Sequence, residues 1–272
     1  MMLTQNQTRR EPWWLRWLQP LTVGLLLAFA FAVASIGVLD RLTANWSWAS
    51  AEMRTLDETA SAEAYENVVR RYASLAESSR PAPDNYSILP LRIQLFIDSL
   101  VLEPAYGGLL LLYMFALRRL ARGPIGGWDW VLQLACLVLA GGIMFDLAEN
   151  GMTIRAAEDG LRELLAQATV EDVHWATQLK WAFLGAAMLI TGCFAINRRI
   201  PAKPRSLRIG AWAAIAVAPL AAVQAARLRF EPTIDALLFL ALGIAFAAAL
   251  MFLGRAVWRL DDSIPREPVG SA

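Results

Sequence analysis

Long stretches without charged residues constrain this fold more than any other feature of the sequence. Residues 20–39 contain no Asp, Glu, Lys or Arg, and as an α-helix they would extend about 30 Å, the thickness of the hydrocarbon core of a bilayer. Five later stretches are similarly apolar, although four of them contain isolated charges. The sequence therefore predicts an all-α polytopic membrane helix bundle, a single membrane domain over residues 1–272. Its six predicted transmembrane helices cover residues 20–39, 95–117, 128–149, 175–197, 209–226 and 233–254.

The balance of residue types agrees with a membrane protein and argues against other classes. Hydrophobic residues make up 57% of the chain and the mean hydropathy is +0.42, whereas a soluble domain is about 45–50% apolar. The net charge of +1 gives no general attraction to nucleic acid. Cys136 and Cys193 lie in separate apolar stretches without the spacing of a metal site or a disulfide framework. We expect both cysteines to pack as small apolar side chains.

A cleaved signal peptide is the alternative to a first transmembrane helix. The sequence Ala49-Ser50-Ala51 offers small residues at the spacing of a cleavage site. However, the preceding apolar stretch is longer than the usual signal-peptide core of about 7–15 residues. We therefore expect an uncleaved first helix.

The only long polar segment covers residues 45–86. Apolar residues recur in it close to helical spacing, as at Met53, Leu56 and Ala60. This pattern predicts an extracytoplasmic amphipathic helical segment that packs on the outer end of the bundle. A role as a cap or as a docking element is the alternative.

Basic residues determine the expected orientation of the chain. Arg and Lys gather before the first span, between the second and third, and between the fourth and fifth, whereas acidic residues prevail in the loops on the other side. Because cytoplasmic loops of membrane proteins carry an excess of Arg and Lys, both termini are expected in the cytoplasm. We expect a multi-pass protein of a cell inner membrane, with the lipid bilayer as its surroundings and with no nucleic-acid partner. No protein partner is indicated.

Several polar residues are expected at one depth, in the outer half of the bundle. Asp146, Glu149 and Asn150 end the third span, and spacings of three and four residues place them on one helix face. Because successive spans alternate in direction, Asp98 in the second span and Lys180 in the fourth lie at a similar depth. Charged groups are costly inside a membrane and tend to face a partner, a cavity or water. We therefore predict that these side chains share one cluster.

The simplest interpretation of this cluster is a structural ion-pair network that could also bind a small ion or ligand. Lys180 would lie between Asp146 and Glu149, and Asn150 would complete the hydrogen bonds. Removing one partner of a buried ion pair costs about 3–5 kcal/mol. Such a network can therefore be indispensable without being catalytic.

A proton- or cation-coupled transporter is the second interpretation, because acids outnumber bases at this depth. Asp146 or Glu149 would carry the proton, Asp98 would be the further carboxylate, and Lys180 would tune or displace a bound cation. A backbone irregularity expected around Pro104 agrees with this interpretation, since transporter sites often use interrupted helices. The two halves of the chain, however, show no inverted repeat.

A metal-dependent membrane hydrolase is the third interpretation. The only histidine, His174, lies at the outer mouth of the fourth span, and with Asp98 and Glu149 it would offer two carboxylates and an imidazole. The sequence contains no HExxH motif, no histidine pair and no G-x-S-x-G motif. We therefore expect His174 at the surface, as a weak candidate metal ligand, and we expect no cofactor. A non-enzymatic role is favoured, and no catalytic residue is indicated.

Short motifs in the middle of the chain resemble those of a group of small bacterial inner-membrane proteins of uncharacterised function. These motifs are Asp98 with Tyr106-Gly107, then the D-x-x-E-N sequence of Asp146-Leu147-Ala148-Glu149-Asn150, and finally Lys180. The resemblance implies a membrane protein and supports the choice of polar residues, but it implies no activity. The candidate ligand or ion cluster comprises Asp98, Tyr106, Asp146, Glu149, Asn150 and Lys180.

Overall fold

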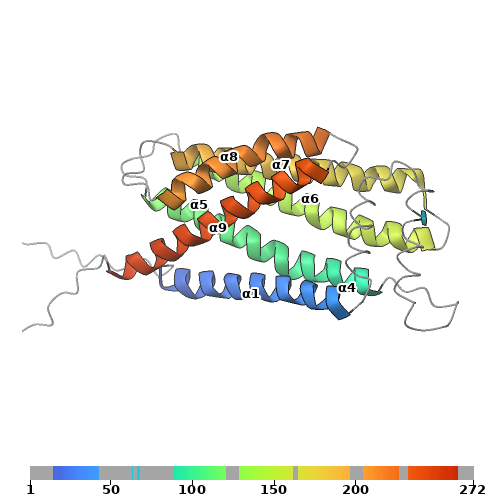
Figure 1. Ribbon diagram of the computed structural model, residues 1–272, viewed down its shortest axis with the longest axis horizontal. Coiled ribbons are helices and arrows are strands. Elements are labelled where there is room, and N and C mark those ends of the chain that lie inside the picture. The colour runs from blue at the N-terminus through green and yellow to red at the C-terminus, as the bar shows by residue number, and fades with distance from the viewer. Residues whose placement is uncertain are drawn as a thin grey trace, which may run out of the picture.

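Helices are the only regular structure in the residues that the computed structural model describes, which are 15–42, 63, 66–67, 89–120, 129–161, 165–196, 205–226 and 232–262. The predicted all-α fold class is thus confirmed. Successive helical rods run in opposite directions along the long axis (Figure 1). The elements are α1 (Leu15–Leu42), α4 (Leu89–Ile97), the π-helical segment η1 (Asp98–Leu102), α5 (Glu103–Leu120), α6 (Asp129–Leu161), α7 (Gln167–Ile196), α8 (Arg205–Ala226) and α9 (Pro232–Asp262). Because α4, η1 and α5 follow one another without a gap, they form a single rod.

The helices have the length and composition of a multi-pass membrane protein. Five segments are long and apolar enough to cross a bilayer, and α1 contributes a shorter apolar stretch, Pro20–Ser35. Large apolar side chains cover the outside of the bundle, among them Leu137 at 70% and Trp212 at 63% exposed. In water such an apolar surface would favour aggregation, whereas in a lipid bilayer it contacts acyl chains without a free-energy penalty. The five segments are Arg92–Arg118, Trp130–Asp159, Gln167–Ile196, Arg205–Ala226 and Ala236–Gly254.

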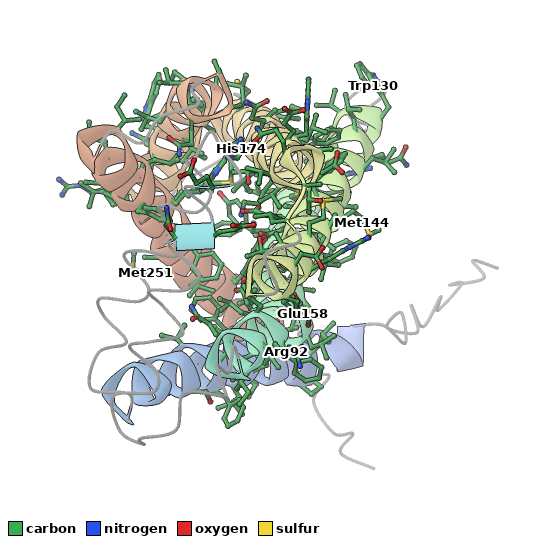
Figure 2. All side chains as sticks on the ribbon, turned by 90° about the vertical axis from the view of Figure 1, so that its right-hand side faces the viewer. Arg92, Trp130, Met144, Glu158, His174 and Met251 are labelled. Carbon is green, nitrogen blue, oxygen red and sulfur yellow. The ribbon has the colours of Figure 1, made fainter. Side chains whose placement is uncertain are left out.

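The helices pack as a curved row that is closed by the α4–α5 rod. In this row α6 packs against α7, α7 against α8, and α8 against α9, while α5 contacts α1, α6 and α9. Viewed along the bundle, Trp130 and Met144 point outward from α6 (Figure 2). Leu109, Leu139 and Leu253 point inward and are at most 1% exposed. The core therefore lies between the α4–α5 rod and the curved row.

Glycines allow close contact between helices of the row. A Cβ atom at Gly192 would lie 2.8 Å from the carbonyl oxygen of Ala211, so no larger residue fits unless α7 and α8 separate. A Cβ atom at Gly210 would lie 2.6 Å from the Cβ atom of Ala248 on α9. Small residues are typical of such contacts in membranes, because they bring the helix backbones into van der Waals contact.

Two helices extend well beyond the predicted spans, at the end of the bundle where α6 leads into α7. The third span was predicted to end at residue 149 and to be followed by a charged loop, but α6 continues to Leu161. The residues after the span contain no proline, and ion pairs such as Arg155 with Asp159, 3.8 Å apart and one turn along, support a helix in water. Likewise α7 begins at Gln167 rather than at residue 175. The predicted amphipathic segment 45–86 lies outside the described residues, apart from residues 63 and 66–67, and stays a prediction.

Candidate functional site

Lys180 of α7 joins two carboxylates of α6. Its Nζ atom lies 2.9 Å from Oδ1 of Asp146 and 2.5 Å from Oε2 of Glu149. The side chains of Lys180, Asp146 and Glu149 are 19%, 14% and 6% exposed, respectively. The two helices are antiparallel neighbours, and the three-residue spacing of the acids places both of them against the ammonium group. These three residues, the Lys180 triad, form ion pairs that hold α6 against α7 inside the membrane-spanning part of the bundle.

Asn150, one residue further along α6, joins that helix to the α4–α5 rod. Its Nδ2 atom donates to Oδ2 of Asp98 at 3.1 Å, to Oγ of Ser99 at 3.1 Å and to Oε1 of Glu103 at 2.8 Å. An amide nitrogen carries only two hydrogens, so three acceptors share two donors. This small network therefore contains more acceptor oxygens than donated hydrogens.

The π-helical segment explains why Asp98 and Glu103 meet at one amide. In η1 the backbone N–H of Glu103 donates to the carbonyl oxygen of Asp98, five residues earlier. In a regular α-helix, residues five apart point in clearly different directions, but the wider π turn brings them closer to one face. Pro104 follows directly and has no N–H with which to continue the α-helical pattern. The irregularity expected around Pro104 thus lies just before it, while α5 itself is regular.

Tyr106 adds a contact from the next turn of α5. Its hydroxyl donates to Oδ2 of Asp146 at 3.1 Å. Asp146 therefore binds Lys180 through one oxygen and Tyr106 through the other. Through this aspartate, the α4–α5 rod, α6 and α7 meet at one point.

Glu103 is the most deeply buried acid of the group. Its exposed fraction is 0%, and its Oε2 atom has no hydrogen-bond partner among the described residues. One oxygen from each of Asp98, Glu103 and Asp146 lies within 4.8 Å of the others. With Glu149 the cluster contains four carboxylates and the single ammonium of Lys180. If all are ionised, three negative charges are left without a compensating cation from the described residues around them.

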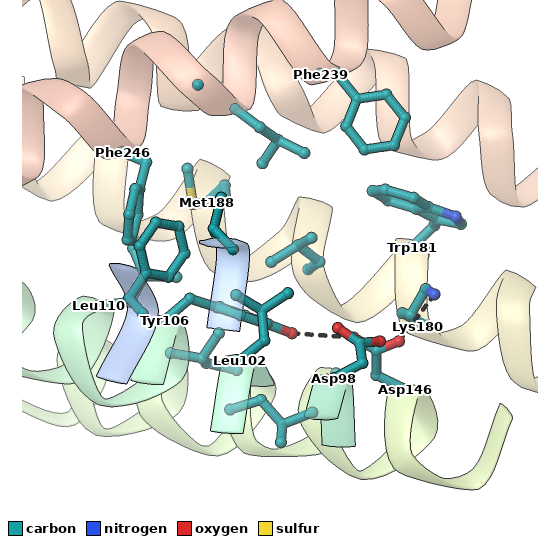
Figure 3. Close-up of a pocket in the computed structure, with 18 residues that line it drawn as sticks. Asp98, Leu102, Tyr106, Leu110, Asp146, Lys180, Trp181, Met188, Phe239 and Phe246 are labelled. Carbon is teal, nitrogen blue, oxygen red and sulfur yellow. Dashed lines mark hydrogen bonds and ion pairs between the residues drawn. The ribbon is translucent and has the colours of Figure 1, made fainter. Parts of the chain in front are cut away.

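A cavity of about 530 Å³ lies beside the cluster. Its charged end is formed by Asp98, Asp146 and Lys180, and the Tyr106 hydroxyl is close by (Figure 3). The rest of the lining is apolar and comes from α1, the α4–α5 rod, α6, α7 and α9. Near Lys180, Trp181 and Phe239 meet edge to face, with ring centroids 6.1 Å apart. The cavity thus combines one charged end with a long apolar wall.

The structure brings the six predicted cluster residues together as two neighbouring networks, one around Lys180 and one around Asn150. Carboxylate oxygens of Asp98 and Asp146, one from each network, lie within 4.8 Å of one another. The functional role of the six residues stays a prediction. Two members of these networks were missed, Ser99 and Glu103. Asn150 also differs from expectation, since it binds the α4–α5 rod instead of completing the Lys180 triad. The signal for Glu103 was available in Pro104, which predicts irregular backbone just before it.

The histidine-containing metal site of the hydrolase interpretation does not form. Among the described residues, the potential ligands that come together are Asp98, Glu103 and Asp146, without His174. His174 precedes Lys180 by six residues, which places it about 9 Å further out along α7. This distance explains why the imidazole does not reach the acidic group.

Comparisons of this chain with protein-family models, with curated proteins and with solved structures gave no match. Its function therefore has to follow from the geometry of the cluster and the cavity.

Proposed function

We propose that this multi-pass membrane protein binds a small amphipathic molecule in the cavity beside the cluster. The ligand would place an apolar body against the aromatic and aliphatic wall and a hydrogen-bond-donating head group, an amine or a hydroxyl, at the charged end. The observation that carries the proposal is the cavity itself, apolar along its length and charged at one end. Basic residues on one side of the predicted spans support a cell inner membrane as its location, with both termini in the cytoplasm.

The size and the lining of the cavity support a small molecule. Ligand pockets in proteins measure about 300–1,000 Å³ and combine mainly apolar walls with a few polar groups that orient the ligand. At about 530 Å³ this cavity lies within that range. Phe29 of α1 and Phe246 of α9, with ring centroids 5.0 Å apart, both line it. A molecule in the cavity would therefore contact several helices at once.

The charges at the polar end support a head group that donates hydrogen bonds. Lys180 is already held by Asp146 and Glu149. Asp98 receives only the neutral amide of Asn150 among the contacts described, so its carboxylate keeps acceptor capacity on the cavity side. An amine would also offset part of the negative surplus, whereas a carboxylate head group would add to it.

A cation-coupled transporter is the second candidate. The surplus of carboxylates beside a cavity favours it, because transporters and pumps use such groups to carry cations or protons. Transport would require the ligand or the cation to cross the bundle, whereas binding alone would not. Uptake by proteoliposomes distinguishes the two.

Two glycines provide a matched test of binding. Gly243 lines the cavity, and a Cβ atom there would meet nothing within 4 Å. Gly24 of α1 has equally open space but does not line the cavity. The Gly243→Leu change would therefore add bulk at the cavity lining from a position with open space around its Cβ atom, while the Gly24→Leu change adds the same side chain elsewhere.

The probe is N-dansyl-1,10-diaminodecane, which keeps one free amine and whose fluorescence rises in an apolar site, titrated into protein in lipid nanodiscs with empty nanodiscs as background. We expect saturable binding by the parent protein and by Gly24→Leu, and loss of saturable binding in Gly243→Leu. Dansyl-labelled decanoic acid should bind more weakly, because its head group is negative. Equal binding by Gly243→Leu and the parent protein would refute the proposal.

A further inference from the structure

We infer that Asp98, Glu103 and Asp146 form a binding site for a divalent cation of about the size of calcium. Two of the three residues, Asp98 and Asp146, also line the charged end of the cavity, whereas Glu103 does not line it. The cation site therefore shares two carboxylates with the ligand site proposed above, and Glu103 distinguishes the two.

The spacing of the three carboxylates fits one ion. A ligand oxygen from each residue lies within 4.8 Å of the other two. Calcium binds oxygens at about 2.3–2.6 Å, so two oxygens on opposite sides of one ion are about 4.6–5.2 Å apart. Magnesium holds its oxygens at about 2.0–2.1 Å in a regular octahedron, whereas calcium accepts a looser and less regular set of oxygens. Figure 3 shows the carboxylates of Asp98 and Asp146 pointing toward one another.

Glu103 supplies the second, independent observation. It is completely buried, and while Oε1 accepts from Asn150, Oε2 has no hydrogen-bond partner in the part of the chain described. A buried oxygen without a partner costs free energy, and a buried carboxylate oxygen costs more than a neutral one. Coordination to a cation would satisfy this atom directly. A role in packing alone would be served as well by an apolar side chain of similar size.

The charges around the site agree with a divalent ion. Four carboxylates face one ammonium within the membrane-spanning part of the bundle, and two further positive charges would remove most of the surplus. Lys180 contacts Glu149 and one of the three proposed ligands, Asp146, and among the described residues it forms no ion pair with the other two ligands. The hydroxyl of Tyr106 donates to Asp146 and so helps to position one of the three carboxylates.

Terbium luminescence tests the site with the metal alone. Tb³⁺ binds calcium sites and emits when a nearby tyrosine or tryptophan is excited, and Tyr106 touches one of the proposed ligands. The protein is stripped with a chelator and placed in nanodiscs of neutral phosphatidylcholine, which removes anionic lipid as a competing site. We expect saturable emission that Ca²⁺ displaces.

The Glu103→Gln variant keeps an oxygen that can accept from Asn150 but removes the charge, and it should weaken Tb³⁺ binding at least about tenfold. The matched control is Glu171→Gln, an exposed acid at the outer end of α7, which should bind like the parent protein. If Glu103→Gln does not purify as a folded protein, Asp98→Asn decides by the same criterion. Absence of saturable emission, or equal affinity in the parent and the folded variant, would overturn the inference.

The outcomes also separate the two sites. Gly243→Leu should lose the amphipathic probe and keep Tb³⁺, whereas Glu103→Gln should lose Tb³⁺. If the probe-binding experiment refutes the ligand site, the Tb³⁺ experiment still tests the cation site, and the reverse also holds.

Discussion

Replacing Lys180 with methionine should destabilise the bundle far more than replacing either of its acidic partners. The ammonium group lies 2.9 Å from Asp146 and 2.5 Å from Glu149, and all three side chains are less than 20% exposed. Without it, two buried carboxylates lose their cation, a loss of about 3–5 kcal/mol. The Asp146→Asn change is milder, because Lys180 keeps Glu149 and the amide oxygen still accepts from Tyr106. We expect it to cost about 1–3 kcal/mol, the range of a hydrogen bond to a charged group.

The two changes together should cost less than the sum of their separate effects. In the double variant only Glu149 is left without its cation, instead of two carboxylates, so the coupling should be about 1–2 kcal/mol. The free energy of unfolding is measured in mixed micelles by titration with a denaturing detergent. Arg155→Met is the control, because that side chain is 80% exposed and its loss should cost less than about 1 kcal/mol. Strictly additive losses, or a smaller loss for Lys180→Met than for Asp146→Asn, would refute the electrostatic reasoning.

Two further predictions concern contacts away from the cluster, and the same unfolding assay checks both. Gly192→Val should lower stability by about 1–3 kcal/mol, because its side chain would collide with the Ala211 carbonyl and separate α7 from α8, whereas Gly24→Val should have little effect. The ion pair between Arg92 and Glu158 should contribute less than about 1 kcal/mol, since its side chains are 50% and 32% exposed. If Arg92→Ala lowered the free energy of unfolding by clearly more than about 1 kcal/mol, the pair would stabilise the bundle more than a surface ion pair can.

The sequence was informative wherever a regular helix determines geometry. Apolar stretches of membrane length identify the rods, and the three- and four-residue spacings in α6 place Asp146, Glu149 and Asn150 together. The alternation of directions places Lys180 and Asp98 at the same depth, and in the structure Lys180 contacts Asp146 and Glu149 while Asn150 contacts Asp98 close by. These inferences need only the α-helical repeat and the thickness of a bilayer.

Features that depend on irregular backbone or on several helices at once were not predictable. Glu103 joins the group only because η1 widens one turn, and α-helical spacing from Asp98 would point it elsewhere. The cavity is formed by side chains from different helices, so no local pattern contains it. The extension of α6 to Leu161 was missed because a helix does not have to end where the bilayer ends.

The π turn of η1 also sets the rotational phase between the two ends of its rod. A wide turn accommodates one residue more than an α turn, and each residue of an α-helix corresponds to about 100° of rotation. A regular α-helix over the same residues would therefore turn α4 by about that angle relative to α5. Arg92 would then face away from Glu158, and Asp98 away from Asn150, while Tyr106 would keep its place beside Asp146. Because the wide turn accommodates the surplus residue, it keeps the α4 end of the rod directed at α6.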